Sequence, residues 1–424
     1  MSKPTELVPA ARCVSAVLFA LLVAFLSCSR QSEAPSIPKP TGPYGVGSAR
    51  FSFVDSTRPE TFTPDPGDFR EVAFRVWFPA LKASCAKRIP YLEQAGELKR
   101  VLPPGMTTSL LDTLGTWQSN SYYDAVLADT GPRFPVVIYS PAYGAGMNAA
   151  TVLMEELASH GYVAVSVGHA FETSHFYRPD GTIRTFGLDN EELKARGIER
   201  GKALDIQRRL NETDDPGELR GIIRAMAEVR PKTEQSLREW VADIGFCIDC
   251  LSALNRDGRF NDRLDLDRIG VVGHSFGGAA SGQACLDDPR CRAGINLDGL
   301  QLGDMLDRPL ERPFLFVHHD NEGAKNKLIN LPFFESAKDT CYLVLVRGTR
   351  HLNLSDISLP GFAEAAGLPE GALGPIDGKR CLRVMNELVR QFFDRHLRGL
   401  PAPLLDGPQD SYPEVELRLR TPRD

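Results

Sequence analysis

The most constraining feature of the chain is the hexapeptide Gly-His-Ser-Phe-Gly-Gly at residues 273–278. A G-x-S-x-G sequence between a strand and a helix is typical of the nucleophile elbow, a sharp turn that lifts a serine above a sheet. The hydrophobic run at 268–272 predicts a short buried strand, and the small residues at 276–286 predict a helix. Glycine suits the strained turn because it carries no Cβ atom. The motif therefore predicts that Ser275 is a catalytic nucleophile.

Strand and helix patterns alternate along most of the chain. Short hydrophobic strands are expected at residues 69–79, 135–139, 162–167, 268–272, 293–297, 313–317 and 341–346. Helices with apolar residues at three- and four-residue spacing are expected at 149–160, 234–255, 276–286 and 379–398. This order predicts an α/β protein with a mainly parallel central sheet and helices on both faces. Together with the elbow, it predicts an α/β-hydrolase fold.

The length and charge of the chain narrow the possibilities further. Its 424 residues suffice for one large hydrolase domain, expected at 44–424, with an insertion. The formal net charge of −6 gives no reason to expect nucleic-acid binding. Residues 182–231 are charged, helix-prone and without strand signals. We expect them to form a helical insertion, either a cap over the site or an external excursion.

The N-terminal segment is expected to direct export rather than to fold. Basic residues precede an apolar run at 14–26, which has the length of a signal peptide. The run ends in Phe-Leu-Ser-Cys, which resembles a bacterial lipobox with Cys28 as the lipidated residue. Residues 1–28 are therefore predicted as a signal sequence and 29–43 as a tether. The protein would be periplasmic, anchored to a membrane surface through a lipidated Cys28 or a retained signal anchor, or secreted.

The cysteines suggest one disulfide and one buried pair. Two of the nine cysteines lie in the N-terminal segment, which leaves seven. An exported protein can form disulfides, and Cys285 and Cys291 are close in sequence and flank a turn, so they are a candidate pair. Cys247 and Cys250 have the C-x-x-C spacing but lie within an apolar-periodic helix. Core packing explains them better than zinc or redox chemistry.

A serine nucleophile needs a base and an acid, which follow it in the order serine, acid, histidine in this fold class. His351 has the best position among the eight histidines, since it follows the last strong strand. Two residues remain as candidates for the acid. Asp298 ends the strand after the elbow unit, and Asp320 ends the next strand. General topology favours the later position, hence Asp320, and composition does not decide between them.

From about residue 69 to residue 396, the chain resembles the type II platelet-activating-factor acetylhydrolases, the lipoprotein-associated phospholipase A2 family. Three segments carry the resemblance: the elbow at 273–278, Leu-Asp-Gly-Leu at 297–300, and 348–356, which fits G-x-x-H-x-N-x-x-D. The resemblance implies a triad of Ser275, Asp298 and His351, with Asp320 as the alternative acid. The family has tryptophan where this chain has Leu300.

The oxyanion hole is expected to use two backbone N–H groups. One is that of Phe276, directly after the nucleophile. The family has S-H-G-x-G-A in the other loop, where this chain has Ser-Pro-Ala-Tyr-Gly-Ala at 140–145, so the resemblance implies Tyr143 as the second donor. The histidine of the family's E-H-R-D segment corresponds to His169, for which we expect a structural or pocket-lining role.

These observations predict an exported serine esterase that needs no metal or organic cofactor. His318, His319 and Asp320 with Glu322 are not expected to share a metal ion, because consecutive residues of a strand point to opposite faces. The resemblance implies short-acyl phospholipid esters as substrates. The alternative is an esterase of the dienelactone-hydrolase or polyester-hydrolase type, acting on non-lipid esters. A third hypothesis is a binding protein on a disabled hydrolase scaffold, although nucleophile and base are both present.

Overall fold

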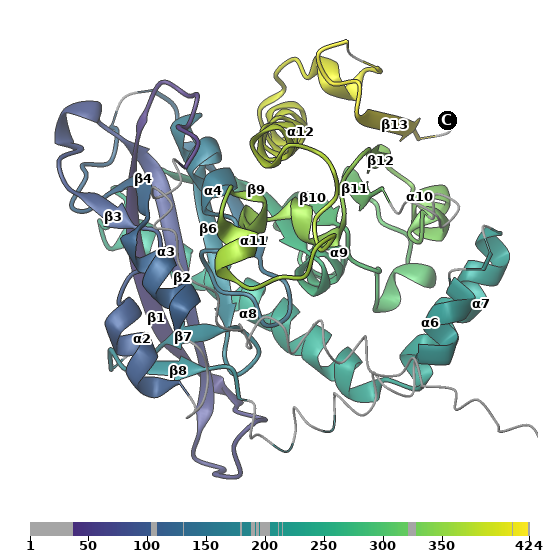
Figure 1. Ribbon diagram of the computed structural model, residues 1–424, viewed down its shortest axis with the longest axis horizontal. Helices are drawn as coiled ribbons and strands as arrows, with labels where there is room; N and C mark the ends of the chain where they lie inside the picture. Colours follow the sequence, from purple (N-terminus) through teal and green to yellow (C-terminus); the bar gives the residue numbers. More distant parts are fainter. Residues whose placement is uncertain are drawn as a thin grey trace, which may run out of the picture.

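The computed structural model describes residues 37–102, 108–129, 131–178, 180–187, 191, 195, 204–210, 212–213, 215–320, 328–408 and 410–422. Its central element is an 11-stranded sheet. The strands are β1 (Gly45–Pro59), β2 (Phe69–Ala80), β3 (Arg88–Pro90), β4 (Gln118–Tyr122), β5 (Phe134–Ser140), β6 (Val163–His169), β9 (Leu264–His274), β10 (Cys291–Leu297), β11 (Phe314–His319), β12 (Cys341–Val346) and β13 (Val415–Arg420). Their order in the sheet is β13-β12-β11-β10-β9-β5-β6-β2-β1-β4-β3 (Figure 1).

The strands from β12 to β6 in this order are all parallel, whereas β13 and β2 pair antiparallel at the two ends of this group. The carboxyl ends of β9, β10, β11 and β12 therefore lie along one edge of the sheet. In open parallel sheets, active sites form at this edge. The arrangement brings the ends of segments that are far apart in sequence into one region.

Helices cover both faces of the sheet. The helices α4 (Thr151–Ser159) and α12 (Gly378–Arg398) pack on one face, and α8 (Pro231–Arg256) and α9 (Phe276–Asp287) pack on the other. Consecutive residues of a strand pack in the hydrophobic cores on opposite faces of the sheet. Val271 packs with α8 and α9, whereas Val272 packs with α4 and α12. Because both faces are buried, the inner strands read as continuous hydrophobic runs, which is why the sequence located them.

The prediction of a mainly parallel sheet with helices on both faces is confirmed, but the structure contains further strands that were not predicted, among them β3, β4 and β13. β9 begins at Leu264, before the expected start at residue 268. The long strand β1 was not predicted, because most of its residues are only partly buried and its pattern is irregular. Within the segment expected to lack strands, β8 (Ile183–Thr185) pairs with β7 (His175–Tyr177) as a short hairpin.

The remaining helical elements are short, except for one in the predicted insertion. They are η2 (Lys82–Ser84), α2 (Ala95–Val101), α3 (Ser109–Thr116), α6 (Leu204–Leu210), α7 (Pro216–Glu228), η3 (Asp304–Leu306), α10 (Leu331–Ser336), η4 (His351–Leu354), η5 (Asp356–Ser358), α11 (Phe362–Ala365) and η6 (Pro403–Leu405). The helix α7 is held beside α10 and η3, since Arg220 donates to the carbonyls of Pro332 and Leu306 at 2.9 and 3.4 Å. The role of the insertion as a cap stays a prediction.

The structure contains the disulfide Cys285–Cys291. Cys247 and Cys250 belong to α8 and are buried in the core, as the sequence analysis predicted. Residues 1–36, including the predicted signal sequence and Cys28, lie outside the described residues. The end of the predicted tether is described: Thr41 and Gly42 donate hydrogen bonds to side chains of α4. Among the helices of the described residues, none is long and apolar enough to cross a membrane.

Candidate active site

Ser275 lies at the turn between β9 and α9, in the strained conformation that the elbow motif predicts. Its φ of 56° and ψ of −119° are rare for a residue with a side chain. The flanking glycines are required by close packing. A Cβ on Gly273 would lie 2.0 Å from the Gly277 carbonyl oxygen, and a Cβ on Gly277 would lie 2.1 Å from that of Ser140. The sequence therefore fixes a tight turn that presents the Ser275 hydroxyl.

His351 lies between Ser275 and Asp298. It begins the short helix η4, which follows β12, and its side chain is partly exposed. The Nε2 atom lies 3.1 Å from Ser275 Oγ, and the Nδ1 atom lies 2.5 Å from Asp298 Oδ2. In neutral imidazole one nitrogen donates and the other accepts. A proton on Nδ1, facing the carboxylate, leaves Nε2 free to accept from the serine hydroxyl.

Asp298 follows β10 directly and has a φ of 60°, a second strained position at this edge of the sheet. Its Oδ1 accepts from the His319 backbone N–H at 3.1 Å, and its Oδ2 lies 2.6 Å from His319 Nδ1. Burial acts to raise the pKa of Asp298, but the hydrogen bonds from His319 and His351 outweigh it and hold the pKa well below its ordinary value. The carboxylate is thus anionic and can orient an imidazole.

Asp320, the alternative acid, lies in a different environment. Its Oδ2 accepts from the Gly348 N–H at 3.0 Å, and its own N–H donates to Thr349 Oγ1 at 3.3 Å. These bonds connect the end of β11 to the loop that carries His351. Asp320 therefore supports the loop, whereas the carboxylate beside the imidazole belongs to Asp298.

The asparagine and aspartate of the segment 348–356 hold the histidine loop in place. Asn353 Oδ1 accepts from the N–H groups of Arg350 and Gly374 at 2.8 and 2.7 Å. Asp356 is buried and accepts from the Val152 N–H of α4 at 3.2 Å. On the other side, His274 Nε2 lies 3.1 Å from the His351 carbonyl oxygen. Burial, and then the nearby His351, lower the pKa of His274 to about 3, so this imidazole is neutral.

The two predicted amide donors, those of Phe276 and Tyr143, lie beside a shared aromatic cluster. Phe276 is the first residue of α9, where N–H groups have no partner within the helix. Tyr143 lies in the loop after β5, and its neighbour Gly144 donates to the Glu172 carbonyl at 2.9 Å. The rings of Phe276 and Tyr143 meet edge to face, and both contact Trp240. The cluster fixes both segments relative to each other.

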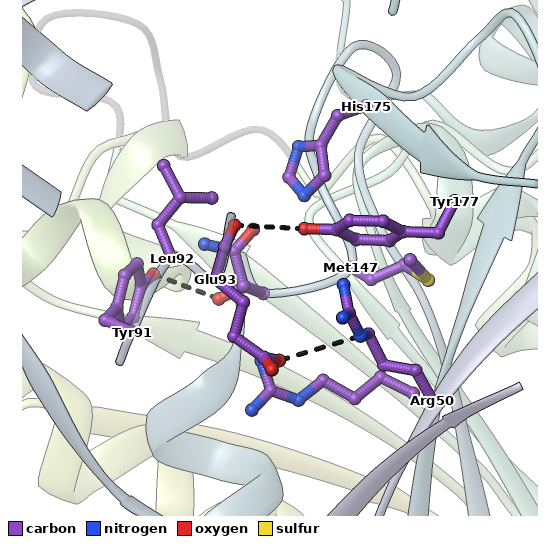
Figure 2. Close-up of a pocket in the computed structure, with 9 residues that line it drawn as sticks. Arg50, Tyr91, Leu92, Glu93, Met147, His175 and Tyr177 are labelled. Atoms are coloured by element: carbon purple, nitrogen blue, oxygen red, sulfur yellow. Dashed lines mark hydrogen bonds and ion pairs between the residues drawn. The ribbon is translucent and has the colours of Figure 1, made fainter. Parts of the chain in front are cut away.

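The far end of the same loop, at Met147 and Asn148, borders a small hollow, which Figure 2 shows together with its lining residues. Tyr91 donates to the Asn148 carbonyl at 2.9 Å, and Tyr177 donates to the Glu93 carbonyl at 3.2 Å (Figure 2). Ser275, Asp298 and His351 do not line this hollow. The hollow is therefore separate from the triad, and the Tyr91 hydrogen bond holds the end of the loop at Asn148.

A buried network lies behind the loop that carries Tyr143. His169 Nε2 lies 3.0 Å from Ser140 Oγ, and His169 Nδ1 lies 2.9 Å from Asp243 Oδ2. Arg70 binds both carboxylate oxygens of Asp243, at 3.1 and 2.7 Å. The His169 ring stacks on Trp240 with ring centres 3.9 Å apart. His169 thus has the structural role expected for it, one layer beneath the proposed oxyanion loop.

Replacement of Asp243 by alanine is expected to destabilise the fold strongly. The guanidinium of Arg70 and the carboxylate of Asp243 are both buried, so the change removes the closer of the two carboxylates that bind Arg70 and leaves only Glu60, at 3.3 Å, beside the buried charge. Removal of one partner of a buried pair costs about 3–5 kcal/mol of unfolding free energy. Urea denaturation, monitored by circular dichroism, measures this loss of unfolding free energy. Glu311→Ala, which removes the exposed partner of Lys338, is the control and should leave the unfolding midpoint near that of the parent protein. An equal midpoint for Asp243→Ala would contradict the prediction.

His319 is the site residue whose contact with the triad the sequence analysis missed. His318 and His319 were expected on opposite faces, but His318 Nδ1 lies 3.9 Å from Asp298 Oδ1, close to the His319 contact with the same carboxylate. Both residues belong to β11, which ends at His319, and both have a ring nitrogen within 4 Å of the carboxylate that follows the neighbouring strand β10. One side-chain nitrogen or oxygen atom from each of Asp298, His319 and His351 lies within 4.8 Å of the other two. Glu322, considered with them in the sequence analysis, lies outside the described residues.

Comparison with known proteins identifies the family. A family profile described as "Platelet-activating factor acetylhydrolase, isoform II" matches residues 29–401. The chain belongs to this family. The resemblance carried by the elbow and by segments 297–300 and 348–356 is therefore confirmed.

Individual relatives agree with this assignment. The platelet-activating factor acetylhydrolase of Canis lupus familiaris is 25% identical over 381 residues, which cover 87% of this chain and 78% of the relative. That of Bos taurus is 24% identical over 387 residues, covering 85% and 77%. A probable 1-alkyl-2-acetylglycerophosphocholine esterase of Arthroderma benhamiae is 30% identical over 166 residues, covering 35% of this chain and 42% of the relative.

The structure resembles that of a ferulic acid esterase from Streptomyces cinnamoneus, with a TM-score of 0.65 and 27% identity, over 91% of this chain and 99% of that one. Together with the parallel sheet, this likeness confirms the α/β-hydrolase fold. Because the matched proteins are named as hydrolases and esterases, the chain is a carboxylic ester hydrolase. This finding opposes the hypothesis of a disabled scaffold.

Proposed function

We propose that Ser275 is the nucleophile of a serine esterase, with His351 as its base and Asp298 as the acid. The distances of 3.1 Å from Ser275 Oγ to His351 Nε2 and 2.5 Å from His351 Nδ1 to Asp298 Oδ2 carry this proposal. His351 takes the serine proton as Oγ attacks the ester carbonyl. Asp298 holds the required tautomer and stabilises the imidazolium that forms.

The chemistry then continues through an acyl-enzyme. The N–H groups of Phe276 and Tyr143 donate to the oxyanion of the tetrahedral intermediate. His351 returns the proton to the departing alcohol, which leaves the acyl group on Ser275. A water molecule gives a proton to His351 and attacks the acyl carbon, and His351 then returns that proton to Ser275 Oγ as the acid is released. These steps need neither a metal ion nor an organic cofactor.

The proposed substrates are phospholipid esters with a short acyl chain. Support comes from family membership over residues 29–401 and from relatives named as acetylhydrolases of platelet-activating factor. The elbow and the histidine segment, which hold the proposed nucleophile and base, match that family.

A specific observation favours a second candidate, an esterase for non-lipid esters such as aromatic acyl esters. The ferulic acid esterase structure matches 99% of its own length. The rings of Phe186 and Phe276 both contact the Tyr143 ring, close to the nucleophile, and could receive a planar acyl group. The oxyanion loop also departs from the family sequence at Pro141 and Ala142. Dienelactone-type and polyester-type substrates belong to the same candidate.

A substrate series distinguishes the two candidates. For a short-acyl phospholipid esterase, we expect kcat/KM for a 2-acetyl phosphatidylcholine to exceed that for the 2-palmitoyl form by about 10-fold or more, since a site that fits an acetyl group would reject the added methylenes. Ethyl ferulate and a soluble polyester oligomer complete the series, with p-nitrophenyl acetate as a reference for intrinsic reactivity. A higher kcat/KM for ethyl ferulate than for the acetyl phospholipid would instead establish the second candidate.

We also propose that the protein is exported and that its N-terminal segment decides how it meets a membrane. The support is the signal-like run at 14–26, which ends at Cys28. Lipidation would anchor the enzyme near phospholipid substrates, whereas ordinary cleavage would release it. Incorporation of labelled fatty acid into the parent protein, but not into Cys28→Ser, is the result expected for the anchored form. Absence of the label from both proteins would indicate secretion or a retained signal anchor.

A further inference from the structure

Two imidazole rings share one oxygen of Asp298. His351 Nδ1 lies 2.5 Å and His319 Nδ1 lies 2.6 Å from Asp298 Oδ2. The other oxygen accepts the backbone N–H of His319 at 3.1 Å. A Ser-His-Asp triad needs only one imidazole on its carboxylate. His319 is therefore a side chain at the site that the proposed mechanism does not use.

The topology explains why His319 reaches this carboxylate. Strands β10 and β11 are parallel neighbours in which Leu297 pairs with Val317. Asp298 directly follows its strand, and His319 lies two positions beyond Val317, so both emerge at the same edge of the sheet. The side chain of His319 is 25% exposed, which allows it to exchange a proton with solvent. Asp298 is 6% exposed and depends on its protein partners.

Resting on the proposed function, we propose that His319 is a positioning residue that weakens the attraction of Asp298 for the protonated form of His351 and thereby extends esterase activity to lower pH. A carboxylate oxygen that accepts two N–H groups divides its negative charge between them. When His319 is cationic, it also offsets the charge of Asp298 and repels an imidazolium at His351. Both effects favour the neutral imidazole that can act as a base.

The groups around His319 are consistent with a cationic state. Burial lowers the pKa of His319, but the hydrogen bond and the charge of Asp298 raise it by more, with Asp320 acting in the same direction and Arg350 opposing it. Burial lowers the pKa of His318 to about 4, so this neighbour stays neutral. The groups that face the two rings are Asp298, Asp320, Arg350, His318 and His274.

The sign of the expected pH effect follows directly. The acid limb of the kcat/KM profile reports protonation of the base in the free enzyme. Because the histidines of the site interact, the midpoint of this limb belongs to the coupled cluster and not to one residue. Removal of His319 gives the whole carboxylate charge to His351, which then binds its proton more tightly. The acid limb should therefore move to higher pH. The ring centres of His319 and His351 are 6.1 Å apart. Two charges at such a separation in a water-like medium shift a midpoint by about half a pH unit.

The test compares the pH profiles of the parent, His319→Asn and His319→Gln proteins, each normalised to its own plateau. Hydrolysis of p-nitrophenyl acetate is followed from well below to well above the ordinary histidine pKa of about 6.5. Asparagine can keep a neutral N–H near Asp298, so it separates the charge from the hydrogen bond. Glutamine provides a second neutral variant should the first not fold, and circular dichroism checks both.

His160→Asn is the matched control. His160 is also a partly exposed histidine beside a carboxylate, with Nε2 3.0 Å from Glu156 Oε1, but it lies outside the site. An upward shift of the acid limb in the His319 variants, with the control at the parent midpoint, is the result expected. An unchanged or lowered midpoint would overturn the inference. Absence of Ser275-dependent turnover in the parent protein would instead refute the proposed function, so the two failures are distinguishable.

Discussion

Replacement of Ser275 by alanine is expected to lower kcat by about 10⁶-fold, the size seen when the nucleophile of a serine hydrolase is removed. The reason is specific to this site. His351 Nε2 lies 3.1 Å from Ser275 Oγ, and alanine offers neither a proton to this base nor an atom to carry the acyl group. Substrate binding does not need the hydroxyl, so KM should change much less than kcat. Steady-state kinetics with p-nitrophenyl acetate measures kcat and KM, and burst kinetics measures acylation and deacylation.

Covalent labelling provides an independent measurement of the same prediction. A fluorophosphonate probe should label the parent protein at Ser275 and should not label Ser275→Ala. Ser336→Ala is the control, since the Ser336 hydroxyl donates to the Phe333 carbonyl in α10, away from the triad. This variant should keep the parent rate and labelling. Equal labelling of Ser275→Ala and the parent would show that another residue reacts, and turnover by that variant would refute the proposed nucleophile.

The inner part of the fold could be predicted from the sequence because strands that are buried on both faces consist of continuous hydrophobic runs. The expected strand at 341–346 agrees with β12, and the expected helix at 379–398 agrees with α12 to within one residue. The outer strand β1 gave a weaker signal, because only a few of its residues are buried and polar residues interrupt its pattern. Secondary structure on the rim of the sheet depends on tertiary pairing, which local sequence does not encode.

The site was partly predictable for the same reason. Ser275 was recognisable because a strained turn needs its neighbouring glycines, and His351 because it follows the last buried strand. The acid could not be identified from the residues alone, because Asp298 and Asp320 both end strands at the same edge of the sheet. A choice between them needs the distances in space. General topology favoured Asp320, whereas the family resemblance favoured Asp298.

The supporting groups could not be predicted because they are far apart in sequence. Asp243 is 74 positions from His169 and 173 from Arg70, and no local pattern links them. His319 was visible as a histidine at a strand end, but its contact with Asp298 depends on the pairing of β11 with β10. A search for titratable residues at the carboxyl ends of neighbouring parallel strands would have found it.

Replacement of Asp298 by asparagine is expected to lower kcat by about 10⁴-fold, whereas Asp320→Asn should lower it by less than about 10-fold. Asp298 accepts hydrogen bonds from His351 Nδ1, His319 Nδ1 and the His319 backbone N–H. An asparagine has one acceptor oxygen and an NH₂ group, so at least one of these donors would face another donor.

When the NH₂ group takes the position of Oδ2, it faces His351, whose imidazole can relieve that conflict only by moving its proton to Nε2, which removes the acceptor that Ser275 needs. Asp320→Asn has no such consequence, because the amide oxygen can still accept from the Gly348 N–H that Asp320 Oδ2 now binds. Steady-state kinetics of the two variants, together with their unfolding midpoints, provides the measurement. A larger loss of kcat for Asp320→Asn, in a protein that is still folded, would transfer the role of the acid to Asp320.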